Sequence, residues 1–180
     1  MARQVALLLC LLLSACQNWP DSYPPPAQSP RVDPPPITAE PSIIDLGAPD
    51  TDSHIVRDVW VGRSQSPWRW TEKRPLLKLQ LHGTVGLKFI VDYSVPEATF
   101  KDTGPVHIAF FVNGRMLATV AVENPGRKYF EKPAPESWLH PAAENTVGAE
   151  IDKLWTDPLR HDKYGFILSE IGFTRIGTQP

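Results

Sequence analysis

The residues Phe110-Phe111-Val112-Asn113-Gly114-Arg115-Met116-Leu117 decide the fold of this chain. Apolar runs flank an Asn-Gly pair, and these two residues tolerate the positive φ angles that a type I′ turn requires. The β-branched and aromatic residues on either side favour strands. The stretch therefore predicts a β-hairpin that turns at residues 113 and 114. Gly114→Val is expected to destabilise it more than Asn113→Ala, because a β-branched side chain resists positive φ.

The same two-residue period recurs along residues 53–178. Leu77, Leu79 and Leu81 alternate with polar residues, which is typical of a strand with one buried face. Similar sets occupy residues 85–93, 106–112, 116–122, 147–151 and 164–174, and no long segment follows the helical period. If extended, Trp68 and Trp70 share one face. About eight or nine short strands with turn signals between them predict an all-β fold, an antiparallel β-sandwich.

Composition divides the chain before this body. About half of the 20 prolines precede residue 50, and proline prevents both helices and central strands. Residues 16–52 are therefore predicted to form a polar, disordered linker in polyproline II conformation, with a reach on the order of 100 Å at about 3.1 Å per residue. A ligand for a proline-recognition domain is the alternative. The apolar island Ile43–Leu46 either docks on the body or stays part of the linker.

The formal net charge is −2 at pH 7, which gives no indication of nucleic-acid binding. The two cysteines, Cys10 and Cys16, both lie near the N-terminus. The body therefore contains neither a disulfide nor a cysteine-based metal site.

Residues 1–15 are predicted to be a signal peptide. Arg3 precedes an apolar run from Val5 to Leu13, which is too short to span a bilayer of roughly 30 Å as a helix. The segment Leu13-Ser14-Ala15-Cys16 resembles the lipobox of bacterial lipoproteins. That resemblance implies cleavage before Cys16, fatty acyl chains such as palmitate on Cys16, and a membrane anchor. Gln17 in place of Asp favours the outer membrane. An ordinary secretory signal is the alternative.

Three further segments suggest a family. The run Trp68-Arg69-Trp70-Thr71, the hairpin at residues 111–114 and the ending at residues 154–171 resemble the galactose-binding-like jelly rolls of bacterial envelope proteins. The resemblance covers roughly residues 56–175 and implies a two-sheet jelly roll. Many such domains act like carbohydrate-binding modules and bind glycans, while others bind proteins. The calcium signature common in that family is not apparent, because Asp157 and Asp162 are isolated.

No catalytic, metal or cofactor site is predicted. The five histidines lack the spacing of a helical zinc site, and no nucleophile elbow or phosphate-binding glycine loop occurs. The candidate ligand-binding residues are loop tryptophans with polar neighbours, since an indole can pack on the C–H face of a sugar ring. They are Trp138 with His140, and Trp155 with Asp157 and Arg160. Alternatively, each tryptophan plugs one end of the core.

These features predict a non-catalytic binding module, tethered to the bacterial envelope by lipid and recognising a glycan or an envelope protein. A structural or assembly subunit of an envelope complex, joined through an apolar or edge-strand surface, is a second hypothesis. An enzyme acting on glycans or esters is a third. A cleft that holds two close carboxylates would favour the enzyme.

Overall fold

The chain folds into two layers of antiparallel strands. The computed structural model describes residues 42–61 and 66–177, so the predicted signal peptide, the lipid site at Cys16 and residues 16–41 of the linker lie outside the described residues. The described strands are β1 (Ser42–Asp45), β2 (Ile55–Val59), β3 (Arg69–Gln80), β4 (Leu87–Val95), β5 (Val106–Val112), β6 (Arg115–Val122), β7 (Gly126–Pro133), β8 (Glu144–Ile151), β9 (Trp155–Thr156), β10 (Lys163–Tyr164) and β11 (Ile167–Arg175).

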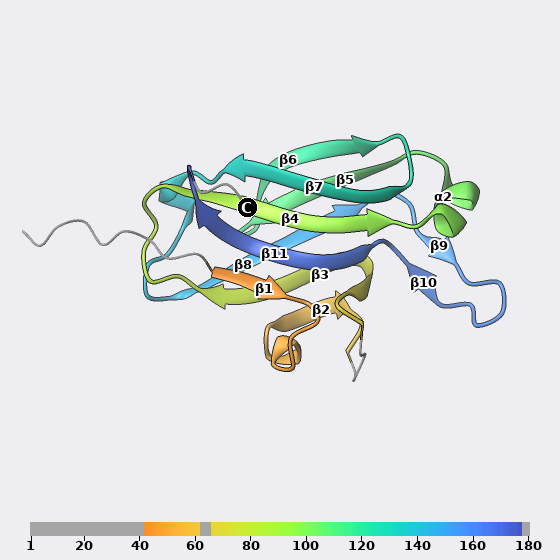
Figure 1. The fold of residues 1–180 in the computed structure, drawn as a ribbon, viewed down its shortest axis with the longest axis horizontal. Coiled ribbons are helices and arrows are strands. Elements are labelled where there is room, and N and C mark those ends of the chain that lie inside the picture. Colours follow the sequence, from red (N-terminus) through yellow and green to blue (C-terminus); the bar gives the residue numbers. More distant parts are fainter. Residues whose placement is uncertain (1–41, 62–65, 178–180) are drawn as a thin grey trace, which may run out of the picture. The chain divides into compact units, whose positions relative to one another are not determined.

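Short helical segments join some of these strands. They are the 3₁₀ turns η2 (Thr51–Ser53) and η3 (Glu136–Trp138) and the helix α2 (Glu97–Thr103). Figure 1 shows α2 at one end of the sandwich, near β9 and β10. Within the described part of the chain, no helix has the length and apolarity needed to cross a membrane.

One hydrogen-bonded order, β6-β5-β8-β3-β11-β4-β7, connects the two layers. We call the layer of β7, β4, β11 and β1 sheet A, and the layer of β6, β5, β8, β3 and β2 sheet B (Figure 1). The strand β3 joins them, because its first residues pair with β11 and its later residues pair with β8. The antiparallel β-sandwich predicted from the sequence is confirmed.

The core lies between the sheets. Leu77, Leu79 and Leu81 are 0%, 4% and 1% exposed, so the alternation read from the sequence is confirmed. Phe110 of sheet B contacts Phe89 and Tyr93 of sheet A, with ring centroids 6.1 and 5.7 Å apart. These aromatic contacts across the layers fix the spacing of the two sheets.

The hairpin that decides the fold is present as predicted. Asn113 has φ 48° and Gly114 has φ 74°, as a type I′ turn requires, and β5 pairs with β6 on either side. The Asn113 side chain does more than turn the chain. Its amide donates to the backbone carbonyl oxygen of Trp138 (2.6 Å) and to the side-chain oxygen of Asn145 (2.8 Å), and its oxygen accepts from the Thr146 N–H (2.7 Å).

Gly114→Val is expected to lower the free energy of unfolding by about 1–3 kcal/mol, because a β-branched residue is strained at positive φ. The hydrogen bonds of Asn113 raise the expected cost of Asn113→Ala to at least that of Gly114→Val, which reverses the order expected from the sequence. Urea denaturation of both variants measures this. If neither variant changes the midpoint, the hairpin does not stabilise the fold.

Residues 42–52 belong to the body, so the predicted linker boundary at residue 52 is wrong. The strand β1 pairs with β11, and Ile44 and Leu46 are 4% and 0% exposed. The apolar island therefore docks. The neighbouring prolines are typical of a linker. Burial of two apolar side chains and the pairing of four residues with β11 nevertheless stabilise this segment on the body.

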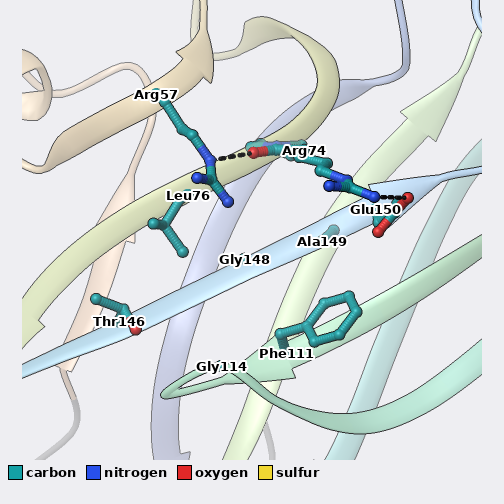
Figure 2. A pocket seen from close by; sticks show the side chains of 10 residues that line it. Arg57, Arg74, Leu76, Phe111, Gly114, Thr146, Gly148, Ala149 and Glu150 are labelled. Atoms are coloured by element: carbon teal, nitrogen blue, oxygen red, sulfur yellow. Dashed lines mark hydrogen bonds and ion pairs between the residues drawn. The ribbon is translucent and has the colours of Figure 1, made fainter.

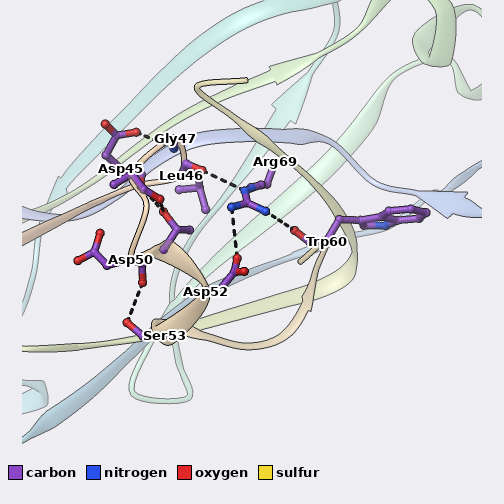
Figure 3. A network of polar contacts seen from close by, with 10 residues as sticks. Asp45, Leu46, Gly47, Asp50, Asp52, Ser53, Trp60 and Arg69 are labelled. Carbon is purple, nitrogen blue, oxygen red and sulfur yellow. Dashed lines mark hydrogen bonds and ion pairs between the residues drawn. The ribbon is translucent and has the colours of Figure 1, made fainter. Parts of the chain in front are cut away.

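A buried arginine holds this segment against β3 (Figure 3). Arg69 is 8% exposed, and its Nε donates to the Leu46 carbonyl oxygen at 3.1 Å. Its other nitrogens reach the Trp60 carbonyl oxygen at 3.4 Å and the Asp52 carboxylate at 3.2 Å. In an extended strand Arg69 points to the face opposite Trp68 and Trp70. The structure shows that this face is the inner one, and Arg69 is buried there.

Candidate functional site

The outer face of sheet A carries a set of polar and aromatic side chains. Because Arg69 and Thr71 point inward, Trp68 and Trp70 point to the outer side at the start of β3. Cross-strand partners in an antiparallel sheet present their side chains on the same face. The strand registers therefore align two outward rows across the sheet. The first row is Trp70, Ile167, Ser94 and Arg127, and the second is Asp45, Glu170, Asp92 and Tyr129.

A pocket of about 470 Å³ lies on this face. Small-ligand sites typically measure roughly 300–1,000 Å³. The half-buried indole of Trp68 lines it, together with the carboxylates of Asp45 and Glu170 and the hydroxyls of Ser94 and Ser169. The pocket thus combines one flat apolar surface with several hydrogen-bonding groups on strands.

An ion pair fixes the positive side of the pocket. The Nε of Arg127 lies 2.9 and 3.1 Å from the two carboxylate oxygens of Asp92, and its Nη2 also contacts that carboxylate. The hydrogen bonds with Asp92, its charge and the charge of Glu170 raise the pKa of Arg127. The guanidinium is therefore held charged at the pocket.

The two remaining carboxylates face the pocket from neighbouring strands. Asp45 accepts a hydrogen bond from the Gly47 N–H at 2.8 Å. The structure shows no side-chain hydrogen bond for Glu170 with any described residue. Glu170 can therefore accept hydrogen bonds from the hydroxyl groups of a ligand.

Aromatic side chains continue from the pocket toward β9 and β10. Trp68 contacts Trp70 edge-on with ring centroids 6.3 Å apart, and Trp70 packs on Tyr164 with ring centroids 4.9 Å apart. The ring of Tyr164 also stacks with that of Trp60, with centroids 5.0 Å apart, and contacts that of Trp155, with centroids 5.9 Å apart. We call these five residues the aromatic strip. Trp60 is 36% exposed, so part of the strip is open to solvent.

Tyr164 lies at the centre of the strip and is 7% exposed. Burial raises the pKa of Tyr164, and the negative charges of Asp162 and Asp157 raise it further. The phenol therefore stays neutral at physiological pH and serves as an apolar support for the indoles around it.

The structure places three predicted ligand residues near one end of the strip. The Trp155 indole N–H donates to the Asp102 carboxylate at 2.7 Å, which ties β9 to α2. Asp157 accepts hydrogen bonds from the N–H groups of Leu159 (2.8 Å) and Arg160 (3.2 Å), so its carboxylate shapes its own loop. The side chain of Arg160 is exposed.

The other two predicted residues lie at the opposite end of β8. Trp138 packs against the core, with the Arg115 guanidinium 5.7 Å from its ring centroid, and the His140 side chain is exposed. Both precede β8, whereas Trp155 follows it, and an eight-residue strand spans about 25 Å. The five predicted residues therefore do not form one site.

Sequence reasoning did not single out the residues of the sheet A pocket as a site. The alternation indicates that Trp68 and Trp70 share one face, but a shared face alone does not distinguish a ligand surface from packing in a sheet. Asp45, Glu170 and Arg127 come together only through pairing between distant strands. No group of three or more His, Cys, Asp or Glu side chains within residues 42–61 and 66–177 is arranged to hold a metal ion.

Comparison with known proteins identifies no family for this chain. No protein-family model and no curated protein matches the chain. Similar solved structures include an acetyl xylan esterase from the rumen bacterium Butyrivibrio proteoclasticus, with TM-score 0.45, 11% identity, and coverage of 77% of this chain and 34% of that chain. Another is a family GH115 4-O-methyl-α-glucuronidase with specificity for decorated arabinogalactans, with TM-score 0.37, 10% identity, and coverage of 84% and 19%.

This chain thus spans about a third of the length of the esterase and about a fifth of that of the glucuronidase. Both TM-scores are below 0.5, and neither similarity carries a conclusion about the function of this chain.

Proposed function

We propose that this chain is a non-catalytic glycan-binding module of the bacterial envelope, and that the sheet A pocket with the aromatic strip is its binding surface. One observation carries the proposal. The Trp68 indole lines the same pocket as Ser94, Glu170 and Arg127. A sugar ring has an apolar C–H face for the indole and hydroxyl groups for the polar side chains.

Two features of the chain support the glycan as ligand. The aromatic strip extends beyond the pocket, so neighbouring sugars of an extended polysaccharide can stack on Trp70 and Trp60. The resemblance of the sequence to galactose-binding-like jelly rolls implies the same ligand class. In this proposal Trp155 is part of the strip and Arg160 lies beside it, while Trp138 and His140 take no part.

Trp68→Ala is expected to weaken glycan binding about tenfold or more, since the stacking surface is lost while the strands remain. The measurement is retention on immobilised envelope and plant polysaccharides, with the full chain carrying Cys16→Ser to avoid the lipid. Met116→Ala is the control, because Met116 is 58% exposed on β6, away from sheet A. Equal retention of Trp68→Ala and the parent protein would contradict the proposal.

The anchor is the second part of the proposal. A lipid on Cys16 would hold the body at the outer membrane, with the following Pro-rich residues as a spacer. Cys16→Ser is expected to move the protein from the membrane fraction to the soluble fraction. The mature N-terminus of the parent protein should carry fatty acyl mass in mass spectrometry. An N-terminal peptide without that mass would exclude the anchor.

Glycoside hydrolysis is a second candidate function, and one observation favours it. Asp45 and Glu170 are register partners that line the same pocket. Such partners have Cβ atoms about 5 Å apart, and carboxyl groups in retaining glycosidases are about 5–5.5 Å apart. This activity would be established if the parent protein releases reducing ends from a glycan and if Asp45→Asn and Glu170→Gln each abolish that release. The binding proposal expects no release from any bound glycan.

A further inference from the structure

A second hollow lies on the opposite side of the sandwich, on the outer face of sheet B (Figure 2). Its volume is about 270 Å³. Leu76 of β3 and Phe111 of β5 are both paired with Gly148 of β8, so the three residues form one row across the sheet. A Cβ at Gly148 would lie 2.5 Å from the Pro75 carbonyl oxygen. Glycine is therefore required there, and no side chain fills the space between Leu76 and Phe111.

An arginine borders this hollow. Figure 2 shows the guanidinium of Arg57 directed toward Leu76 and the floor of the hollow. Its Nε donates to the Arg74 carbonyl oxygen at 3.3 Å. Among the described residues, the structure shows no partner for its two terminal nitrogens. They can therefore donate two parallel hydrogen bonds to one ligand.

The other charged side chains near the hollow already have hydrogen-bond partners. Arg74 forms an ion pair with Glu150 at 2.9 Å. The Asp58 carboxylate, which lies outside the lining, accepts a hydrogen bond from the Arg74 backbone N–H at 2.9 Å. The two arginines and one glutamate that line the hollow leave one positive charge, on Arg57. A planar guanidinium fork suits a carboxylate, which it binds through two hydrogen bonds.

From these observations we infer that the hollow binds a carboxylated pyranose, that is, a hexuronate residue of an acidic polysaccharide. The sugar carboxylate pairs with Arg57, and the C–H face of the ring packs on Phe111 and Leu76. Glu150, held by Arg74, accepts hydrogen bonds from ring hydroxyls. A small inorganic anion would use Arg57 and leave the apolar row unused.

The two outer faces differ in charge, so they are expected to bind ligands of different charge. The sheet A pocket contains Asp45 and Glu170, which disfavour an acidic sugar there. The hollow on sheet B carries the excess positive charge. The inference concerns a different surface from the proposed function and does not depend on it. If the proposed function and this inference both hold, one protein molecule binds a neutral glycan segment on sheet A and an acidic one on sheet B. Binding of the first segment then raises the effective concentration of the second.

The test uses the full chain with Cys16→Ser and isothermal titration calorimetry. The probes are trimers of galacturonate, glucuronate and mannuronate, the methyl ester of the best-binding trimer, and sodium sulfate. At least one trimer should bind, and its methyl ester should bind at least tenfold more weakly. Arg57→Gln should show the same tenfold loss. Lys101→Gln, which removes an exposed positive charge on α2, should bind normally.

Two further variants locate the ligand. Phe111→Leu should weaken trimer binding, and Trp68→Ala should leave it unchanged, because Trp68 lies on sheet A. The inference is overturned if no trimer binds to the parent protein. It is also overturned if the methyl ester binds to the parent protein as tightly as the trimer does, or if Arg57→Gln binds the trimer as tightly as the parent protein does. Competition by sulfate at the same concentration as the trimer would overturn it too. Loss of trimer binding in Trp68→Ala would place the acidic ligand on sheet A and also overturn it.

Discussion

Asn145→Ala is expected to lower the free energy of unfolding by about 3–5 kcal/mol. Asn145 is 0% exposed, at the start of β8. Its side-chain oxygen accepts from the Asn113 amide and from the His140 N–H, both at 2.8 Å. Its amide donates to the carbonyl oxygens of His140 (2.8 Å) and Ala143 (3.0 Å). Alanine would remove these four hydrogen bonds, although the Asn113 amide keeps its bond to the Trp138 carbonyl oxygen. Each buried group left unpaired costs about 1–3 kcal/mol.

Chemical denaturation followed by tryptophan fluorescence measures this effect. Asn124→Ala is the matched control, because Asn124 is exposed in the loop between β6 and β7, and its cost should stay within about 0.5 kcal/mol. A loss below about 1 kcal/mol for Asn145→Ala would show that water replaces the network at little cost. The hydrogen bonds of Asn145 would then not stabilise the junction of the hairpin with the Trp138 loop.

Gly172→Ala is expected to detach β1 from the body. The new Cβ would lie 2.2 Å from the Ser42 carbonyl oxygen and 2.8 Å from the Ile43 Cα, both backbone atoms of β1. The strand must move, and Ile44 and Leu46 then lose their burial. Full burial of one such side chain contributes about 1.5–3 kcal/mol, so we expect the two together to cost about 3–6 kcal/mol.

Hydrogen exchange of the β1 amides and protease cleavage within residues 42–52 report the detachment. Gly86→Ala is the control, because Gly86 has φ 69° and a Cβ there would meet no other atom within 4 Å, so this variant tests backbone strain alone. That strain costs about 1–3 kcal/mol and should leave β1 protected. Protected β1 amides in Gly172→Ala would show that β11 can shift to accommodate the methyl group.

The sequence predicted the parts of the fold that depend on local patterns. Alternation identified the buried face of Leu77, Leu79 and Leu81, and the turn chemistry of Asn113 and Gly114 placed a hairpin correctly. The strand β1 has only four residues next to prolines, so the local pattern leaves open whether this island docks or belongs to the linker. Its partner β11 begins more than a hundred residues later, and no local pattern reveals such a pairing.

The candidate site was harder to predict for the same reason. Tryptophans in predicted loops, such as Trp138 and Trp155, attract attention in a sequence. The structure places them in η3 and β9, at opposite ends of β8. The sheet A pocket depends on the register that sets Glu170 beside Asp45 on one side and Asp92 on the other. A shift of one residue in that register would turn Glu170 into the core.

The most direct test of glycan binding on sheet A is ¹⁹F NMR of the full chain labelled with 5-fluorotryptophan, carrying Cys16→Ser. Each signal is assigned by single Trp→Phe variants, and the neutral polysaccharide retained best is then titrated in. We predict that the Trp68 and Trp70 signals shift with one common affinity, while the Trp138 signal stays in place. A shift of Trp138 alone, or no shift at saturating glycan, would contradict the account.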